Sequence, residues 1–236
     1  IYILLTSLTF LVVGCQNESE EIRLINQAER LFDAYPDSVI TTLDSIPLPE
    51  EMSPRLIARW CMLYARAADK IEDEMPYTNQ LEIALKYYQK KKMREEEAEI
   101  GLYLGRSYVE DKEYEKAMRA YSDALKVALA IKDYNRAGYI CSYMGDLYEV
   151  DLRYILAAEK YKESGKYFHL ANNTTSYVRA FVNEAHSYSI ADSSYLALAS
   201  LKQAEMVMDS LNVEEVRSYV SVSYTHLRAH ETGRNL

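Results

Sequence analysis

Small and aromatic side chains recur along this chain every 40 residues. Gly105 and Tyr108 have counterparts at Gly145 and Tyr148, and the same register continues through Ala185. Three successive units therefore contain the strings L-G-R-S-Y, M-G-D-L-Y and E-A-H-S-Y, and an alanine follows nine residues after each tyrosine: Ala117, Ala157 and Ala197. A repeat of this length indicates stacked copies of one structural unit, each of which buries its apolar face against its neighbour.

The pattern of apolar positions predicts paired helices joined by short turns. Ser53 before Pro54 is typical of a helix start, with a capping residue followed by proline in the first turn. The expected helices cover residues 19–34, 37–46, 54–70, 78–90, 93–110, 114–131, 135–150, 153–170, 175–190 and 194–210, and a further helix begins at 213. Turns are expected at Lys132-Asp133, Asn172-Asn173 and Asp192-Ser193.

The small residues of the repeat predict where paired helices cross. Gly105 is expected to face Ala117, because two small side chains allow the backbones to approach closely. Tyr108 and Tyr121 then fill the space beside the crossing. The extra length of the repeat is expected to lie in longer helices.

Composition and charge narrow the fold class. The 236 residues include only seven glycines and five prolines, and every proline lies before residue 77. So few turn-forming residues argue against a sandwich or barrel and favour an all-α fold. The net charge of −9 argues against a protein that tracks nucleic-acid phosphates.

Five positions carry a resemblance to the tetratricopeptide repeat (TPR): Gly105, Tyr108, Ala117, Tyr121 and Ala124. The resemblance covers about 58–217, in four units, although the period departs from the usual length of about 34 residues. It implies an all-α, right-handed superhelical array of antiparallel helix hairpins, a TPR-like solenoid.

The N-terminus resembles a bacterial lipoprotein signal. Residues 1–14 carry no charge and are too few to span a membrane, but they suit the apolar core of a secretory signal. The string V-V-G-C resembles a lipobox, which implies lipidation of Cys15, followed by an acidic tether over 15–21. The alternative is an ordinary apolar helix with a chance cysteine. Since residue 1 is Ile and no positive segment precedes the core, the N-terminus is expected to be incomplete.

The residues after Cys15 indicate where the protein is located in the cell. Gln16 after the lipobox resembles sorting to the outer rather than the inner membrane, which implies a lipid-anchored protein of the Gram-negative envelope. The acidic run Q-N-E-S-E-E is either a solvated linker or similar to a surface-export signal. The sequence leaves open whether the protein faces the periplasm or the cell surface.

Residues 22–57 are expected to form an N-terminal helical cap on the array. The string A-E-R-L-F-D-A-Y-P-D-S-V-I-T-T-L-D-S-I resembles the opening of lipid-anchored bacterial TPR proteins, and the similarity continues through R-W-C-M-L-Y-A-R-A-A-D-K. It implies that this chain is the sensory or assembly part of a longer protein.

The last residues break the period. Residues 218–236 begin another unit plausibly, but Thr225 and Arg228 stand where a small and an aromatic residue are due. The end of the chain resembles a translated sequencing-adapter tail, and 222–236 are expected to have no helix to bury against. The alternative is a metal site, since His226 and His230 are four residues apart.

No pattern in the chain predicts catalysis. The phosphate-binding, dinucleotide-binding, zinc-protease and nucleophile-elbow motifs are all missing from the sequence, so neither an enzyme nor a cofactor or metal site is expected. Cys61 and Cys141 hold the same register position two units apart, which predicts buried core residues rather than a disulfide.

The TPR resemblance implies a binding groove lined by the second, fifth and ninth positions of each unit. Arg66 and Arg106 would then lie in neighbouring units and clamp a carboxylate or an acidic peptide. The alternative is that they pair with Asp69 or Glu99. The full set is Arg59, Met62, Arg66, Glu99, Leu102, Arg106, Tyr139, Ser142, Asp146, Arg179, Val182 and His186.

Two functions follow as hypotheses. The first is a lipid-anchored envelope scaffold that binds a protein or peptide in the concave groove. The alternative is a glycan-binding accessory lipoprotein of a nutrient-uptake system, which would need long insertions with exposed Trp or Tyr; the turns are short and Trp60 is the only tryptophan.

Overall fold

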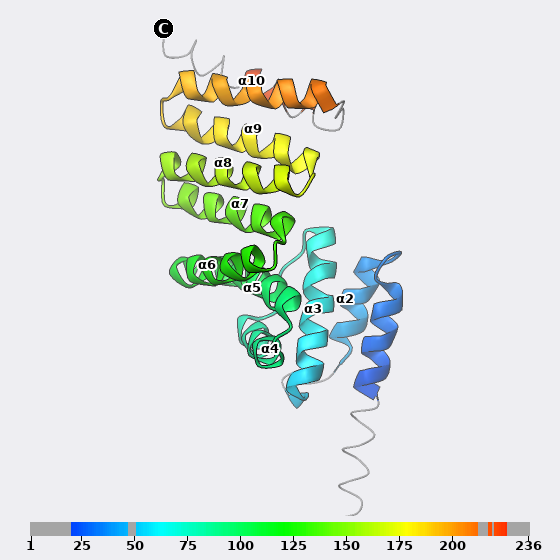
Figure 1. Cartoon of the computed structure of the whole chain (residues 1–236). Coiled ribbons are helices and arrows are strands. Elements are labelled where there is room, and N and C mark those ends of the chain that lie inside the picture. Colours follow the sequence, from blue (N-terminus) through cyan, green and yellow to red (C-terminus); the bar gives the residue numbers. More distant parts are fainter. Residues whose placement is uncertain (1–19, 47–50, 212–216, 219, 226–236) are drawn as a thin grey trace, which may run out of the picture. The chain divides into compact units, whose positions relative to one another are not determined.

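The computed structural model describes residues 20–46, 51–211, 217–218 and 220–225. The chain forms helices within these ranges, and inside each of two compact units the helices pack against their neighbours in sequence order (Figure 1). The chain divides into two compact units, Ile1–Glu113 and Tyr114–Leu236. The all-α prediction is confirmed.

The first unit is a set of consecutive antiparallel helices. A first helix, described over 20–31, precedes α2 (Pro36–Asp44), α3 (Pro54–Ile71), α4 (Thr78–Lys91) and α5 (Arg94–Glu110). Proline occupies the first turn of both α2 and α3, where its missing N–H costs no hydrogen bond. The start predicted at Ser53 and Pro54 is therefore confirmed.

The second unit continues the same pattern with more uniform helices. It contains α6 (Tyr114–Ala130), α7 (Tyr134–Val150), α8 (Tyr154–Leu170), α9 (Thr174–Ile190) and α10 (Ser194–Leu211), followed by helical residues 217, 218 and 220–225. The predicted helices agree with these bounds to within a few residues. One difference is that 32–34 form a turn, where the sequence pattern had continued the first helix.

A left-handed residue ends each half of the repeat. The positions with positive φ are spaced 20 residues apart: Glu72, Lys92, Lys112, Lys132, Leu152, Asn172 and Asp192. In each case the next amide donates to a carbonyl five residues earlier, as Glu113 N does to Tyr108 O and Arg153 N to Tyr148 O, both at 2.8 Å. This is the Schellman ending of a helix, and glycine is its usual left-handed residue. A helix of 17 residues and a three-residue turn therefore account for each half of the 40-residue period.

Glycines in the second unit let aromatic rings approach the helix backbone. A Cβ added at Gly145 would lie 2.8 Å from the Tyr161 ring, and one added at Gly138 would lie 2.7 Å from the Phe168 ring. The crossing that the sequence predicted is that of Gly105 with Ala117, and it stays a prediction. At the equivalent Gly145 the nearest side-chain atoms are those of the Tyr161 ring.

The core of the first unit surrounds the only tryptophan. Trp60 is buried, and its Nε1 donates to the Leu43 carbonyl at 3.2 Å. Next to it Cys61 is buried and free, as is Cys141 in the second unit, so the predicted core role of both cysteines is confirmed. Burial raises the pKa of the Cys141 thiol to about 12 and raises that of Cys61 further.

The last described helix corrects one expectation about the end of the chain. Val220 is buried among the side chains of the second unit, and Tyr224 packs against the same cluster. The Tyr224 hydroxyl also donates to Glu205 at 3.2 Å. The expectation that 222–236 have nothing to pack against is therefore wrong for Tyr224. His226 and His230 lie outside the described residues.

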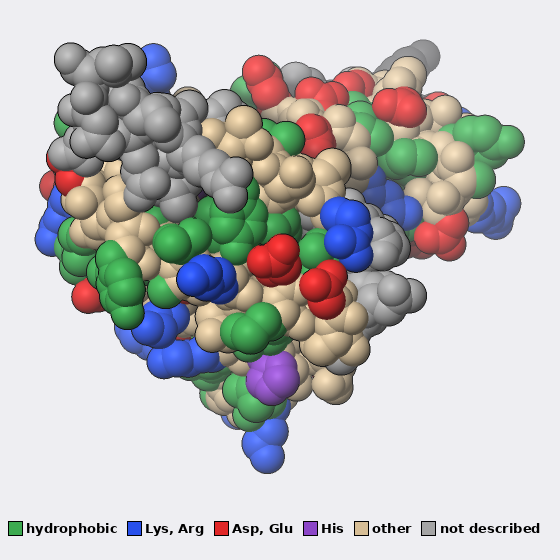
Figure 2. Space-filling view, turned by 90° about the horizontal axis from the view of Figure 1, so that it is seen from above, with side chains coloured by type: hydrophobic (Ala, Val, Ile, Leu, Met, Phe, Trp, Pro, Cys, Tyr) green, Lys and Arg blue, Asp and Glu red, His purple; other side chains and the backbone are tan. Residues whose placement is uncertain are grey.

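Hydrophobic, acidic and basic side chains are interspersed on the surface shown in Figure 2. Several large apolar side chains are exposed, among them Leu152, Tyr195 and Met206. Tyr195 and Met206 lie on α10, and Leu152 lies in the turn between α7 and α8.

Candidate functional site

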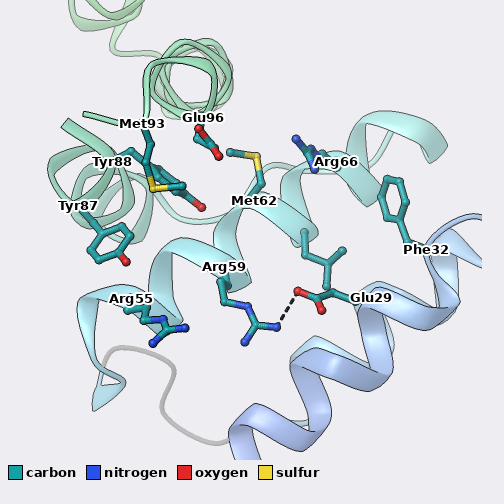
Figure 3. A pocket seen from close by; sticks show the side chains of 11 residues that line it. Glu29, Phe32, Arg55, Arg59, Met62, Arg66, Tyr87, Tyr88, Met93 and Glu96 are labelled. Atoms are coloured by element: carbon teal, nitrogen blue, oxygen red, sulfur yellow. Dashed lines mark hydrogen bonds and ion pairs between the residues drawn. The ribbon is translucent and has the colours of Figure 1, made fainter. Parts of the chain in front are cut away.

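A cleft in the first unit gathers three arginines, two tyrosines and two methionines. It has a volume of about 600 Å³ and is lined by side chains from the first helix, α3, α4 and the start of α5 (Figure 3). We call it the unit-1 cleft. Its lining residues are Glu29, Phe32, Arg55, Arg59, Met62, Leu63, Arg66, Tyr87, Tyr88, Met93 and Glu96.

Two of the three arginines are held by carboxylates. Arg59 donates to Glu29 at 2.7 Å and to Asn26 at 2.8 Å. Arg66 makes a bidentate pair with Glu99, with Nε and Nη2 at 2.6 and 2.7 Å from the two oxygens. These hydrogen bonds raise the pKa of the Arg66 guanidinium, which is charged throughout the ordinary pH range.

One cation and one anion that line the cleft have no partner in the part of the chain that the structure describes. Among the described residues, neither Arg55 on α3 nor Glu96 on α5 has an ion-pair or hydrogen-bond partner, and both line the cleft. Figure 3 shows them on opposite sides of it. The cleft can therefore offer a positive group at one side and a negative group at the other.

Apolar and aromatic side chains form the wall of the cleft between Arg55 and Glu96. Met62 and Leu63 come from α3, and Tyr87 and Tyr88 come from α4. The Tyr88 hydroxyl donates to the Ala58 carbonyl at 3.0 Å, so its ring is fixed in place. Met93 adds a flexible thioether, a side chain that adapts to ligands of different shape.

The structure brings together the predicted groove residues of the first repeat. Arg59, Met62 and Arg66 all line the unit-1 cleft, and Glu99 contacts Arg66. The sequence analysis missed Arg55, Tyr87 and Glu96. Arg55 stands four residues before Arg59 on one helix, a spacing that places both on the same face and could have revealed it.

The predicted arginine clamp is replaced by ion pairs within the protein. Arg66 pairs with Glu99, and Arg106 forms a hydrogen-bonded ion pair with Asp69. These are the acids that the sequence had offered as the alternative, and that alternative is confirmed. Leu102 is buried and does not line the unit-1 cleft, so its place in a groove stays a prediction. A leucine at that register position contributes to the core.

The predicted groove residues of the second unit do not form one site. Tyr139 contacts the Phe168 ring edge-on at 4.9 Å, and Asp146 accepts a hydrogen bond from Tyr161 at 2.6 Å. Val182 is buried in the core of the second unit, and its role in binding stays a prediction. The remaining residues are half-buried or exposed: Ser142, Arg179 and His186.

Other predicted features have limited support in the described part of the chain. No cluster of three or more His, Cys, Asp or Glu side chains there could hold a metal ion. No described helix is both long and apolar enough to cross a membrane. The predicted lipidation site, Cys15, lies outside the described residues. Trp60, which a glycan platform would need to expose, is buried.

The fold and its period define a TPR-like helical-repeat protein. No protein-family model matches the chain, and no curated protein does. Among solved structures, apo RapI is 11% identical, with a TM-score of 0.67 over 91% of this chain and 84% of that chain. BtubC (BKLC) from P. vanneervenii is 17% identical, with a TM-score of 0.55 over 80% of this chain and 75% of that chain. At these identities the likeness establishes the helical-repeat fold alone.

Proposed function

We propose that this chain is a lipid-anchored envelope scaffold that binds a protein or peptide segment in the unit-1 cleft. The observation that carries the proposal is that Arg55 and Glu96 have no ion-pair or hydrogen-bond partner among the described residues. They lie on opposite sides of a cleft with an apolar wall. Helical-repeat folds are compatible with protein binding. No catalytic step, cofactor or nucleic acid is part of the proposal.

The chemistry of the cleft specifies the segment it would take. An acidic side chain would pair with Arg55 and a basic side chain with Glu96, because both groups lack a partner among the described residues. An apolar side chain between them would contact Met62, Met93 and Tyr87. Arg59 and Arg66 would keep their own carboxylates and form the rim.

The binding test uses charge reversal. A random 12-residue peptide library displayed on phage is panned against the chain carrying Cys15→Ser, and enriched peptides are titrated by fluorescence anisotropy. Arg55→Glu and Glu96→Lys should each weaken binding by about tenfold or more, because a like charge then faces the peptide. The matched control is Arg119→Glu, an exposed arginine on α6 in the other unit; it should leave binding unchanged.

The most stringent test exchanges the charges on both the protein and the peptide. A peptide with its acidic and basic residues interchanged should bind the double variant Arg55→Glu/Glu96→Lys better than it binds the original protein. If panning enriches no peptide, or if all variants bind alike, the cleft is not the binding site.

The anchor is tested separately. A cell expressing the chain with its native leader is fed an alkyne-labelled fatty acid, and incorporation is compared for the original protein and Cys15→Ser. Label should appear on the original protein only, since the lipid is attached through the Cys15 sulfur. Equal labelling of both proteins would remove the lipoprotein assignment and leave the binding proposal standing.

A further inference from the structure

A second pocket lies in the other unit, between α8 and α9. It has a volume of about 380 Å³, and residues that line it include Gly165 and Lys166 on α8 and Tyr177, Phe181 and Glu184 on α9. We call it the α8–α9 pocket. A volume of this size is within the range of small-molecule sites.

This pocket is separate from the groove that the sequence predicted. Tyr177, Phe181 and Glu184 recur on α9 at intervals of four and three residues, so they share one face of the helix. Arg179 and His186 fall on the opposite face by the same 3.6-residue period.

One wall of the pocket is a row of aromatic rings. The ring of Tyr177 is 5.1 Å from that of His169 and 4.9 Å from that of Phe181, measured between centroids. Gly165 faces this wall, because a Cβ added there would lie 3.6 Å from the Tyr177 ring. The gap between Gly165 and the Tyr177 ring therefore has room for no more than a methyl group, and a ligand ring would stack on the part of the aromatic wall that faces the open side of the pocket.

The charges around the pocket are unequal. Lys162 and Lys166 are exposed, lie one turn apart on α8 and make no ion pair with the described residues. The opposing charge is Glu184, which is 5% exposed. Burial raises the pKa of that carboxyl, while Lys162 and a hydrogen bond with Ser200 act in the other direction. The lysines thus give the exposed side of the pocket a positive potential.

We propose that the α8–α9 pocket binds a small aromatic carboxylate. Its ring would stack on the Tyr177–Phe181 wall beside Gly165, and its carboxylate would pair with Lys162 and Lys166. The apolar interior selects the ring and the paired lysines select the anion. The volume suits one ring with a short side chain better than an extended peptide. This inference is independent of the unit-1 cleft.

The experiment uses 3-phenylpropionate as the probe and 3-phenylpropionamide as its neutral match. Binding to the chain carrying Cys15→Ser is measured by ligand-observed NMR titration. The acid should bind with a Kd on the order of a millimolar, as expected for so small a ligand. The amide should bind about fivefold more weakly or worse, because it loses the ion pairs.

Variants with opposite expected effects locate the site. Gly165→Leu should abolish binding by filling the pocket, and Lys166→Glu should weaken it about tenfold. Glu184→Gln should strengthen it, because the variant removes the one negative charge that opposes the ligand. Lys202→Glu on α10 is the matched surface control, and Arg55→Glu tests the unit-1 cleft; neither should change the titration.

Several results would overturn the proposal. They are equal binding of acid and amide, binding that survives Gly165→Leu with an unchanged helical signal, and no binding at 10 mM probe, a ceiling about tenfold above the expected Kd. A fourth is a capped peptide ending in phenylalanine that binds more than about tenfold tighter than 3-phenylpropionate, which would make this a peptide site. If Gly165→Leu fails to fold, the opposite shifts of Lys166→Glu and Glu184→Gln still decide the matter.

Discussion

Replacing Gly145 with alanine tests how α7 packs on α8. The added Cβ would lie 2.8 Å from Cε1 and 2.9 Å from Cζ of Tyr161, whereas carbon atoms pack comfortably at about 3.5–4 Å. The ring must therefore retreat by up to about 1 Å. It is almost fully buried, and its hydroxyl is held by Asp146 at 2.6 Å. Retreat thus disturbs both the core and a hydrogen bond.

The magnitude follows from opposing contributions. Overpacking costs about 1–3 kcal/mol, and weakening the Tyr161 hydrogen bond costs up to about 1 kcal/mol more. Alanine in a helix interior returns about 1 kcal/mol relative to glycine. Together these contributions lower the free energy of unfolding of Gly145→Ala by up to about 3 kcal/mol.

The matched control is the same substitution in the next helix. A Cβ at Gly165 would lie 3.4 Å from the Ala180 Cβ, an ordinary contact. Gly165→Ala should therefore be neutral or stabilise by up to about 1 kcal/mol through helix propensity alone. Since helix propensity contributes equally to both, the two alanine variants should differ by about 1–4 kcal/mol although their chemistry is identical.

The assay is urea unfolding followed by circular dichroism at 222 nm. Fluorescence of Trp60, the only tryptophan, reports on the first unit in the same samples. In a Tyr161→Ala background the penalty at Gly145 should vanish, because the ring that the Cβ would meet is gone. Equal unfolding midpoints for the two alanine variants, or a penalty that persists without the ring, would refute the reasoning.

Three further outcomes are expected. Leu152→Gly should stabilise by about 0.5–1 kcal/mol, because an exposed leucine holds a left-handed position that glycine adopts without strain; a lower urea midpoint would contradict this. Glu184→Gln should stabilise at neutral pH, and the gain should disappear as the pH falls below the usual glutamate pKa. Burial raises the pKa of Glu184 in the folded state, so its charge destabilises the fold only above the usual glutamate pKa. If urea titrations show a gain in stability that does not depend on pH, the charge of Glu184 is not its cause. In the Cys15→Ser chain, Cys61 and Cys141 should react with Ellman's reagent only after denaturation, and a thiol that reacts within seconds in the native protein would contradict their burial.

Helix positions were predictable because two local signals agree along most of the chain. The period of small and aromatic residues set the pairing, Pro54 marked a helix start, and Asn172-Asn173 marked a turn. The Asn173 side chain indeed accepts a hydrogen bond from the Ser176 amide at 3.1 Å. The predicted boundaries depended only on neighbours along the chain, which is why they hold.

Contacts between helices were less predictable. The pairing of Gly145 with Tyr161 depends on how far a ring leans across the interface, and a repeat period carries no such information. The binding site was partly predictable for the same reason. Register placed Arg59 and Arg66 on one face, but only the arrangement of the first helix, α3 and α5 reveals that both have carboxylate partners and that Arg55 has none among the described residues.

The 20-residue spacing of left-handed positions also limits which insertions and deletions the gene could tolerate. Removing residues 134–173 would join Asp133 to Thr174, and both Tyr134 and Thr174 begin a helix two residues after a left-handed one. The shortened chain would keep every remaining turn in its present backbone conformation. A deletion of 39 or 41 residues would instead place a left-handed residue inside a helix or lengthen a turn. Changes in the number of repeats are therefore expected in whole multiples of the period, with partial units removed by selection.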